Sequence, residues 1–448
     1  MVKKQGSRFV CTNCGAVASA WSGRCAVCGE WNTLQEEVIL SKNDIASSSG
    51  LTLKTEPVKT ATKHDQPRLK SEMTEVDEVL GGGFVPGSVN LIAGQPGIGK
   101  STLLLQLAQQ IAKRFKVLYV SGEESAHQIG LRAQRLGVDE ANLHIATSSS
   151  ADDIAKTIAD AKYRMVIVDS IQTTTCSDLN SASGSVSQIT GSAQILTAAA
   201  KKTGTALILV GHVTKDGSVA GPKVLEHLVD VVLQMEGDTY GGFKILRSTK
   251  NRFGSITETG IFEMLDNGLQ PVENPSAALL AERQTTDGSV VFATIEGTRP
   301  LLVEIQALVN RTSYGYPKRT ASGIDLNRVN LLVAVLERRT KLKLSDQDIY
   351  INVVGGIRIS EPAADLAVCM AIGSAAKGLQ LSSNAVVFGE VGLSGEIRRV
   401  PFLEKRLVEA KKLGFEAAIA PSQKPKDKDP MLRSVNNVRD ALNKFLKQ

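Results

Sequence analysis

The sequence predicts an α/β protein: a mostly parallel sheet covered by helices, preceded by a small metal-binding module and followed by a second α/β unit. Strand-like apolar runs alternate with amphipathic helical segments between residues 66 and 270. A glycine-rich loop joins one of these runs to a helical segment. Four cysteines stand in two closely spaced pairs near the N-terminus. These three observations define the predicted fold class.

Length and composition limit the function classes. A chain of 448 residues exceeds one core, and about two to four domains are expected. Hydrophobic residues make up 42% and charged residues 22%, which is typical of globular domains. No apolar run is long enough to cross a bilayer, and the N-terminus lacks the apolar stretch of a secretory signal. We therefore expect a cytoplasmic protein with no membrane partner.

The charge balance is compatible with a nucleic-acid partner. The formal net charge is +6, which is too mild to identify such a partner alone. Aromatic residues are only 4% of the chain, which argues against binding built mainly on base stacking.

The first module predicts a zinc site. Its cysteines have the C-x-x-C…C-x-x-C spacing in which two tight turns present four thiolates to one tetrahedral ion. They are Cys11, Cys14, Cys25 and Cys28. A pair of disulfides is the alternative, disfavoured in a reducing cytosol. A module of this size buries little core, so Zn²⁺ is expected to supply most of its folding free energy.

Composition also predicts the domain boundaries. We expect a Cys₄ zinc module at residues 1–34 and a linker at 35–65, where a small polar run precedes a Lys/Thr-rich stretch. The phosphate-loop domain is expected at 66–270 and the second α/β domain at 271–448.

The glycine-rich loop fits the motif G-x-x-x-x-G-K-[ST] without a mismatch. A buried strand (89–93) precedes it and helical apolar spacing (102–113) follows it. Such a loop points backbone N–H groups at phosphate oxygens, Lys100 reaches the β- and γ-phosphates, and Ser101 is a Mg²⁺ ligand. The predicted ATP-binding residues are Gly94, Gln95, Pro96, Gly97, Ile98, Gly99, Lys100, Ser101 and Thr102.

The ends of further strands carry the candidates for Mg²⁺ binding, for activation of the attacking water and for sensing the γ-phosphate. The strands are expected at 89–93, 116–122, 165–170, 205–212 and 229–236. Asp169 ends a buried strand and is predicted to hold Mg²⁺. Glu123 and Glu124 end another; Glu123 is favoured as the base that activates water, because adjacent residues point to opposite faces. The alternative is a solvated acidic pair. His212 is either a γ-phosphate sensor or a structural histidine.

Two Gly/Ser-rich segments follow strand ends on the same edge, at residues 177–191 and 214–222. They are either DNA-contacting loops, with Lys215 and Lys223 as phosphate contacts, or ordinary surface loops. Lys250 and Arg252 lie on alternate residues of an extended segment. They are either cations that act on the γ-phosphate of a neighbouring subunit or part of a solvated turn.

Taken together, the motifs CTNCG with CAVCGEW, GQPGIGKST, YVSGEES and KNRFG closely resemble the bacterial RadA/Sms DNA-repair family over nearly the whole chain. The phosphate-loop core resembles the RecA family. The resemblance implies that Glu123 activates water and that Lys250 and Arg252 act across a subunit boundary. It also implies a hexameric ring that threads DNA and drives branch migration, with single-stranded and branched DNA and a RecA-type recombinase as partners.

The C-terminal unit resembles the protease domain of the Lon family, with a departure. Ala363 occupies the position of the Lon serine nucleophile, and Glu404, next to Lys405, aligns with the Lon lysine. Without a hydroxyl nucleophile a Ser/Lys mechanism cannot start. We therefore expect a non-catalytic domain. Basic residues within 311–319 are candidates for duplex-DNA contact, with a solvated loop as the alternative.

The resulting prediction is a DNA-dependent ATPase that drives branch migration in recombinational repair. A nucleotide-switched recombination mediator that does not translocate is the alternative, because both would use the same active-site residues. An ATP-dependent protease is disfavoured by Ala363.

Overall fold

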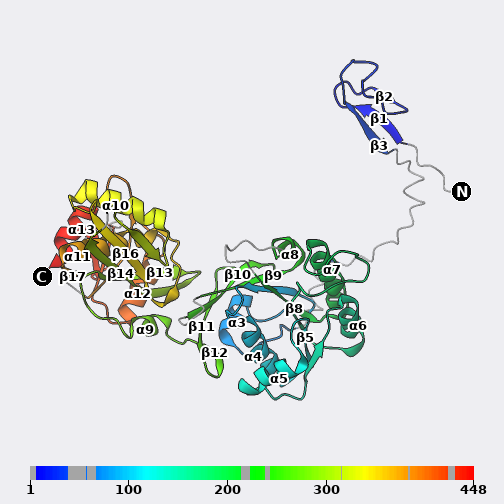
Figure 1. The fold of residues 1–448 in the computed structure, drawn as a ribbon, viewed down its shortest axis with the longest axis horizontal. Helices are drawn as coiled ribbons and strands as arrows, with labels where there is room; N and C mark the ends of the chain where they lie inside the picture. Colours follow the sequence, from blue (N-terminus) through cyan, green and yellow to red (C-terminus); the bar gives the residue numbers. More distant parts are fainter. Residues whose placement is uncertain are drawn as a thin grey trace. The chain divides into compact units, whose positions relative to one another are not determined.

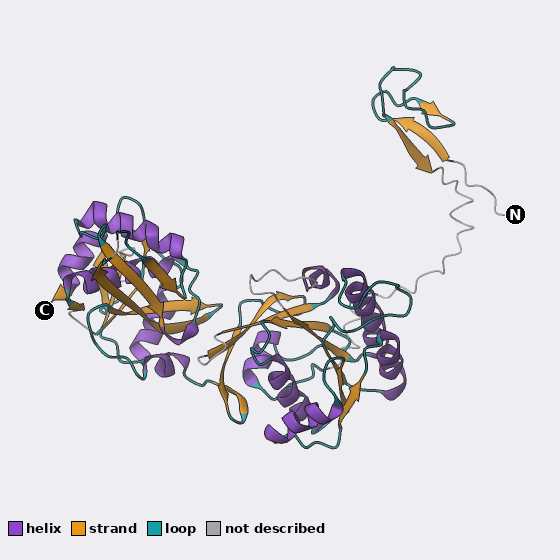
Figure 2. Cartoon of the chain, in the orientation of Figure 1, coloured by secondary structure: helices purple, strands orange, loops and turns teal. Residues whose placement is uncertain are grey.

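A computed structural model describes residues 7–38, 57, 67–212, 222–237, 243–313, 315–381, 384–421 and 429–447. The chain divides into two compact units, Met1–Asp65 and Gln66–Gln448. Figure 1 shows the order of the elements along the chain, and Figure 2 shows the helices and strands of each unit. Within the described residues, no helix is both long and apolar enough to cross a membrane.

The N-terminal unit is a small antiparallel sheet in the order β2-β1-β3. Its strands are β1 (Ser7–Cys11), β2 (Val17–Ala18) and β3 (Leu34–Val38). Among its described side chains, the buried cluster consists of Cys11, Cys25 and Leu34, so this core is hardly more than the cysteine cluster itself. Strand β3 pairs with β1 as far as Val38 opposite Ser7 and so runs into the range predicted as linker. The polar sequence LQEEV concealed this strand, which Leu34 anchors in the core.

The second unit begins with a nine-stranded sheet in the order β12-β11-β10-β9-β4-β8-β7-β5-β6. Strands β9 to β6 in this order are parallel, and the β10, β11 and β12 edge is antiparallel. The strands are β4 (Val89–Gly94), β5 (Val117–Ser121), β6 (Leu143–Thr147), β7 (Met165–Asp169), β8 (Ala206–His212), β9 (Val231–Gly237), β10 (Phe243–Asn251), β11 (Thr259–Leu265) and β12 (Gly268–Pro271).

Helices cover both faces of this sheet (Figure 2). One face packs against α3 (Thr74–Leu80), α4 (Lys100–Ala112) and α5 (Ala126–Arg135). The other packs against α6 (Ala151–Ala161), α7 (Val186–Thr203) and α8 (Pro222–Leu228). Strands β4, β5 and β7 are buried along their whole length, which explains why their uninterrupted apolar runs were predictable.

The segment predicted as a loop at 177–191 differs in the structure. Helix α7 begins at Val186, because the Ser185 hydroxyl accepts from the backbone N–H of Gln188 and caps the helix. Only the part up to Ser185 is irregular. The second predicted loop lies almost wholly outside the described residues: Lys215 is not described, nor is the side chain of Lys223.

The C-terminal part contains a seven-stranded mixed sheet in the order β15-β16-β14-β13-β18-β21-β22. Its strands are β13 (Ser289–Glu296), β14 (Arg299–Arg311), β15 (Arg319–Ser322), β16 (Gln347–Val353), β18 (Ala385–Val387), β21 (Ala417–Pro421) and β22 (Leu432–Val435). Two small sheets pair β17 (Gln380–Leu381) with β23 (Leu446–Lys447) and β19 (Glu390–Val391) with β20 (Ile397–Arg398).

Five helices accompany this sheet among the described residues: α9 (Pro275–Leu280), α10 (Leu326–Thr340), α11 (Asp365–Lys377), α12 (Leu403–Lys412) and α13 (Val438–Phe445). Helix α11 packs on β13 and β14 and is itself covered by α10 and α13. Every residue from Asp365 to Ser374 is buried, which makes α11 the central helix of this core.

Candidate nucleotide and metal sites

The phosphate loop connects β4 to α4, as the sequence predicts. Gly97 and Gly99 have φ values of 78° and 112°, in the left-handed region that favours glycine. A Cβ atom on Gly99 would also approach the Met264 Cε atom to 2.7 Å. Both glycines are therefore required by the turn, independently of any ligand.

Lys100 is buried at the start of α4, with 4% of its surface exposed. Its Nζ atom donates to the carbonyl oxygens of Gly94 (2.8 Å) and Gln95 (3.0 Å). Burial lowers the pKa of Lys100 to about 8, although Asp169 and Glu123 act in the opposite direction. A buried ammonium group held mainly by carbonyls fits an anionic ligand such as a phosphate chain.

Asp169 lies beside the phosphate loop at the end of β7. Its Oδ2 atom accepts from Ser101 Oγ (2.7 Å) and from the Tyr119 hydroxyl (2.5 Å). Burial, together with the Asp169 charge, raises the pKa of Tyr119 well above its usual range, so the phenol stays a donor. The serine hydroxyl and carboxylate oxygens form the hard donor set that Mg²⁺ prefers, and these residues fit that ion.

The two glutamates lie in the bend that follows β5 and have different partners. Glu123 Oε1 accepts from Ser170 Oγ (2.5 Å) and lies 3.8 Å from His212 Nε2. Glu124 forms an ion pair with Arg132 of α5 instead. The structure thus brings Glu123, and not Glu124, to the side occupied by Asp169 and His212; its role in activating water stays a prediction.

His212 ends β8 between Lys100 and Glu123. Burial lowers its pKa, and the neighbouring Lys100 charge adds to this effect. Its Nδ1 atom is buried and has no hydrogen-bond partner among the described residues. This free acceptor or donor position is compatible with a γ-phosphate sensor, and that role stays a prediction.

A cavity of about 650 Å³ opens above the phosphate loop. Sequence reasoning missed two of its walls, one from α5 and one from the hairpin that joins β11 to β12. The lining residues are Gly97, Gly99, Lys100, Ser101, Thr102, Arg132, Arg135, Leu136, His212, Met264, Leu265, Asp266 and Gly268. Gln106 of α4 holds the hairpin through two hydrogen bonds to the backbone of Leu269. No local sequence pattern predicts this contact, because Gln106 and Leu269 are far apart in the sequence.

Lys250 and Arg252 are not among the residues that line this cavity. Lys250 Nζ donates to the carbonyl oxygens of Glu226 (2.5 Å) and Val229 (2.8 Å) at the end of α8. Arg252 Nη1 lies 3.0 Å from Asp230 Oδ1, and about half of its side chain (52%) is exposed. Both cations therefore gather around one end of β9, apart from the phosphate loop of their own chain.

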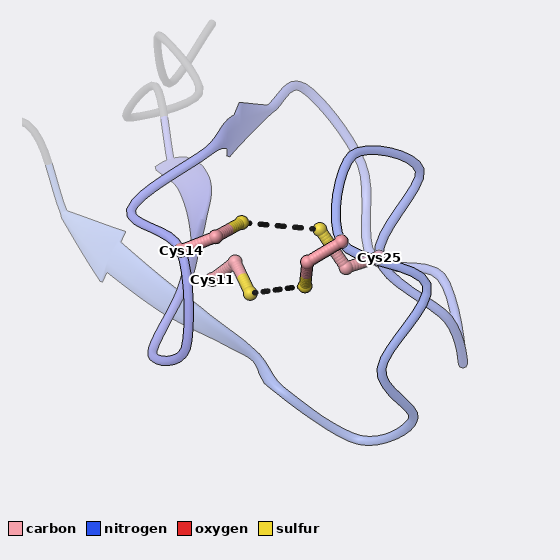
Figure 3. Close-up of side chains that lie close together, drawn as sticks. Cys11, Cys14 and Cys25 are labelled. Carbon is pink, nitrogen blue, oxygen red and sulfur yellow. Dashed lines mark hydrogen bonds between the residues drawn. The ribbon is translucent and has the colours of Figure 1, made fainter.

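The four N-terminal cysteines form one compact cluster (Figure 3). Their sulfur atoms all lie within 4.8 Å of one another; Cys11–Cys28 and Cys14–Cys25 are 3.6 and 3.7 Å apart. A tetrahedral zinc ion with Zn–S bonds of about 2.3 Å places sulfurs about 3.8 Å apart, so the cluster fits Zn²⁺. These separations are far longer than a disulfide bond of about 2.05 Å. The cysteines are therefore free thiols arranged as zinc ligands.

In the C-terminal part, Ala363 is buried at the position expected for a serine nucleophile. Glu404 is exposed on α12, and Lys405 Nζ donates to the Thr298 carbonyl oxygen (2.9 Å). Among the charged residues of α12, Arg406 is the fully buried one, and it pairs with Glu361 at 2.5 Å. Sequence reasoning missed this ion pair.

The basic segment at residues 311–319 joins β14 to β15. Arg311 and Tyr316 are strongly exposed, at 85% of the Arg311 side chain and 88% of Tyr316. Tyr314 lies outside the described residues.

The central strand order β9-β4-β8-β7-β5, with the phosphate loop after β4 and acidic side chains after β7 and β5, defines a RecA-like P-loop ATPase. A Cys₄ zinc ribbon precedes this core, and a Lon-like α/β domain follows it. Three family models match: AAA domain (residues 54–218), Rubredoxin metal binding domain (9–36) and Subunit ChlI of Mg-chelatase (326–424).

Curated relatives cover nearly the whole chain. The DNA repair protein RadA of Bacillus subtilis is 47% identical, over 98% of this chain and 98% of the relative. The RadA proteins of Halalkalibacterium halodurans and Escherichia coli are 45% and 44% identical, over 94% and 99% of both chains. The chain belongs to the RadA family of DNA repair proteins.

Solved structures resemble about half of the chain, and only loosely. The crystal structure of the RadB recombinase is 23% identical with a TM-score of 0.37, over 46% of this chain and 100% of that one. A KaiC-like protein from Pyrococcus horikoshii is 22% identical with a TM-score of 0.39, over 46% and 99%.

Proposed function

We propose that this protein is a DNA-dependent ATPase motor that promotes branch migration during homologous recombination and DNA repair. The observation that carries the proposal is the gathering of Lys100, Ser101, Asp169 and Glu123 at one end of the parallel strands, beside the cavity above the phosphate loop. The RadA relatives are named as DNA repair proteins, which supports the biological context. The cytoplasm is the proposed location.

Each residue has a proposed role. Lys100 binds the phosphates as a cation, and Glu123 accepts a proton from the attacking water while Ser170 Oγ orients its carboxylate. Ser101 and Asp169 would hold Mg²⁺, which neutralises phosphate charge when bound. His212 would respond to the γ-phosphate, and its ring nitrogen without a partner among the described residues supports this role.

We further propose that the active site is completed by a neighbouring subunit in a hexameric ring. Lys250 and Arg252 gather apart from the phosphate loop of their own chain, which supports an action on the next subunit. Single-stranded and branched DNA and a RecA-type recombinase are the proposed partners. The Lon-like domain is proposed to be non-catalytic, because buried Ala363 offers no nucleophile.

The decisive experiment separates hydrolysis from nucleotide binding. Glu123→Gln keeps the size and the hydrogen bonding of the side chain but removes the base. A motor should lose ATP turnover and branch migration on this change while still binding ATP. Lys100→Ala should lose ATP binding as well, and Asp139→Asn, at an exposed position outside the helices and strands, is the matched control.

The alternative, a nucleotide-switched mediator, predicts a different outcome. Glu123→Gln would then remain locked in the ATP-bound form and would support strand exchange at the wild-type rate or faster. ATP turnover measured with and without single-stranded DNA tests the DNA dependence. Turnover indifferent to DNA would contradict the proposed motor.

A further inference from the structure

Arg132 lines the nucleotide cavity but is not one of the predicted site residues. It lines the cavity together with Lys100 and Ser101. Helix α5 begins shortly after β5, and a reciprocal capping box between Ser125 and Gln128 fixes its first turn. The position of Arg132 relative to the end of β5 is therefore set by the backbone.

The two ends of the Arg132 guanidinium group have different surroundings. Nη2 donates to Glu124 Oε1. Nη1 is buried and has no hydrogen-bond partner among the described residues. A buried charged N–H without an acceptor is destabilising, and such atoms in binding sites are expected to meet an acceptor on the ligand.

The anchor of Arg132 is itself held in place. The Ser121 hydroxyl accepts from the backbone N–H groups of both Glu123 (3.2 Å) and Glu124 (2.9 Å), which fixes the turn. From this turn Glu123 reaches Ser170, whereas Glu124 reaches α5. Arg132 is therefore held by Glu124 and not by the proposed water-activating group, Glu123.

We propose that Arg132 is a nucleotide-binding residue, that its Nη1 donates to the bound nucleoside triphosphate, and that Glu124 orients it. This inference rests on the proposed ATP site. Because the partner of Arg132 is Glu124 and not the proposed water-activating Glu123, its contact is assigned to the part of the nucleotide shared by ATP and ADP. It binds the ground state and the transition state alike, so it sets KM and not kcat.

The test compares Arg132→Gln with Gln134→Ala, an exposed position on the same helix that does not line the cavity. Titration calorimetry with Mg-ATP and with Mg-ADP should show dissociation constants about 10- to 100-fold weaker for Arg132→Gln, equally for both nucleotides. In steady-state assays KM should rise and kcat should stay near the wild-type value. Wild-type affinity, or a loss confined to kcat, would overturn the proposal.

Glu124→Gln tests the orienting role. It should weaken binding less than Arg132→Gln does, and the two changes should be non-additive in the double variant. Additive losses would mean that Glu124 acts independently of Arg132. Should Arg132→Gln not fold, judged by circular dichroism, Arg132→Lys keeps the charge but loses the fork, and the same titrations then apply with a smaller expected loss.

Lys100→Ala distinguishes this inference from the proposed ATP site. If Lys100→Ala leaves ATP binding and turnover unchanged, the ATP site itself is wrong. If Lys100→Ala abolishes both while Arg132→Gln binds nucleotide normally, only the role of Arg132 is wrong.

Discussion

Replacing Arg252 by alanine should abolish ATP turnover while leaving each subunit folded. A cation supplied to the γ-phosphate by a neighbouring subunit contributes about 10³-fold or more to kcat. The cost to the subunit is small, because the Arg252 side chain is 52% exposed and its ion pair with Asp230 is partly solvated. In the variant, the Asp230 carboxylate still accepts a hydrogen bond from the backbone N–H of Val89 (3.1 Å). It also still lies 3.9 Å from Lys201 Nζ. We expect unfolding free energy to fall by only about 1 kcal/mol.

Mixing two inactive variants decides whether Arg252 acts on its own chain or on the next one. Arg252→Ala subunits keep an intact phosphate loop, and Lys100→Ala subunits keep an intact Arg252. In rings assembled from equal amounts, about one quarter of the boundaries combine both intact halves, so turnover should return to about that fraction of wild type. Each variant alone, at the same total concentration, is the control.

Two results would show that Arg252 does not act on a neighbouring subunit. If no mixture recovers turnover although the two variants co-assemble, Arg252 does not act across a boundary. If Arg252→Ala alone retains wild-type kcat, it has no role in the chemistry, and its contact with Asp230 is then its whole function.

Three further outcomes are expected. Cys25→Ser should lose the zinc found by elemental analysis and unfold the N-terminal module, as seen in its proteolysis; a variant that keeps one zinc per chain would contradict the four-thiolate site. Arg406→Met should destabilise the Lon-like domain by about 3–5 kcal/mol in denaturant unfolding, because it leaves the Glu361 carboxylate without its cation; the double change with Glu361→Gln should recover part of this loss. ATP binding should weaken as pH rises through about 8, because Lys100 then loses the proton that phosphate binding needs; calorimetry should show proton uptake on binding near this pH, and a Lys100→Arg variant without this pH dependence is the control.

The parts of the fold visible in the sequence are those in which neighbouring residues share one environment. Strands β4, β5 and β7 are buried on both faces, so their apolar runs are continuous. Strand β6 was missed because it lies at the sheet edge, where none of its residues is fully buried. The start of α7 was missed because its first turn is polar and depends on the Ser185 cap rather than on apolar spacing.

The phosphate loop, the paired cysteines and the carboxylate of Asp169 were predictable because each depends on spacing within one short segment. Glu123 was favoured over Glu124 by the same local reasoning; in the structure Glu123 contacts Ser170 and Glu124 contacts Arg132, and the catalytic role of Glu123 stays a prediction. Such features depend on backbone geometry over a few residues, so the identity and order of those residues are sufficient to predict them.

Only the folded chain brings Arg132 and the hairpin of Met264 to the nucleotide cavity, and only there does Asp230 meet Arg252. The Lon-like domain likewise buries Arg406 against Glu361, a pairing invisible in a helix rich in charged residues. These contacts join residues from separate elements, and their energies depend on burial and on the approach of distant backbones. The order of residues in the sequence reveals neither the burial nor the approach of distant backbones, because both arise only after the sheets and helices have packed.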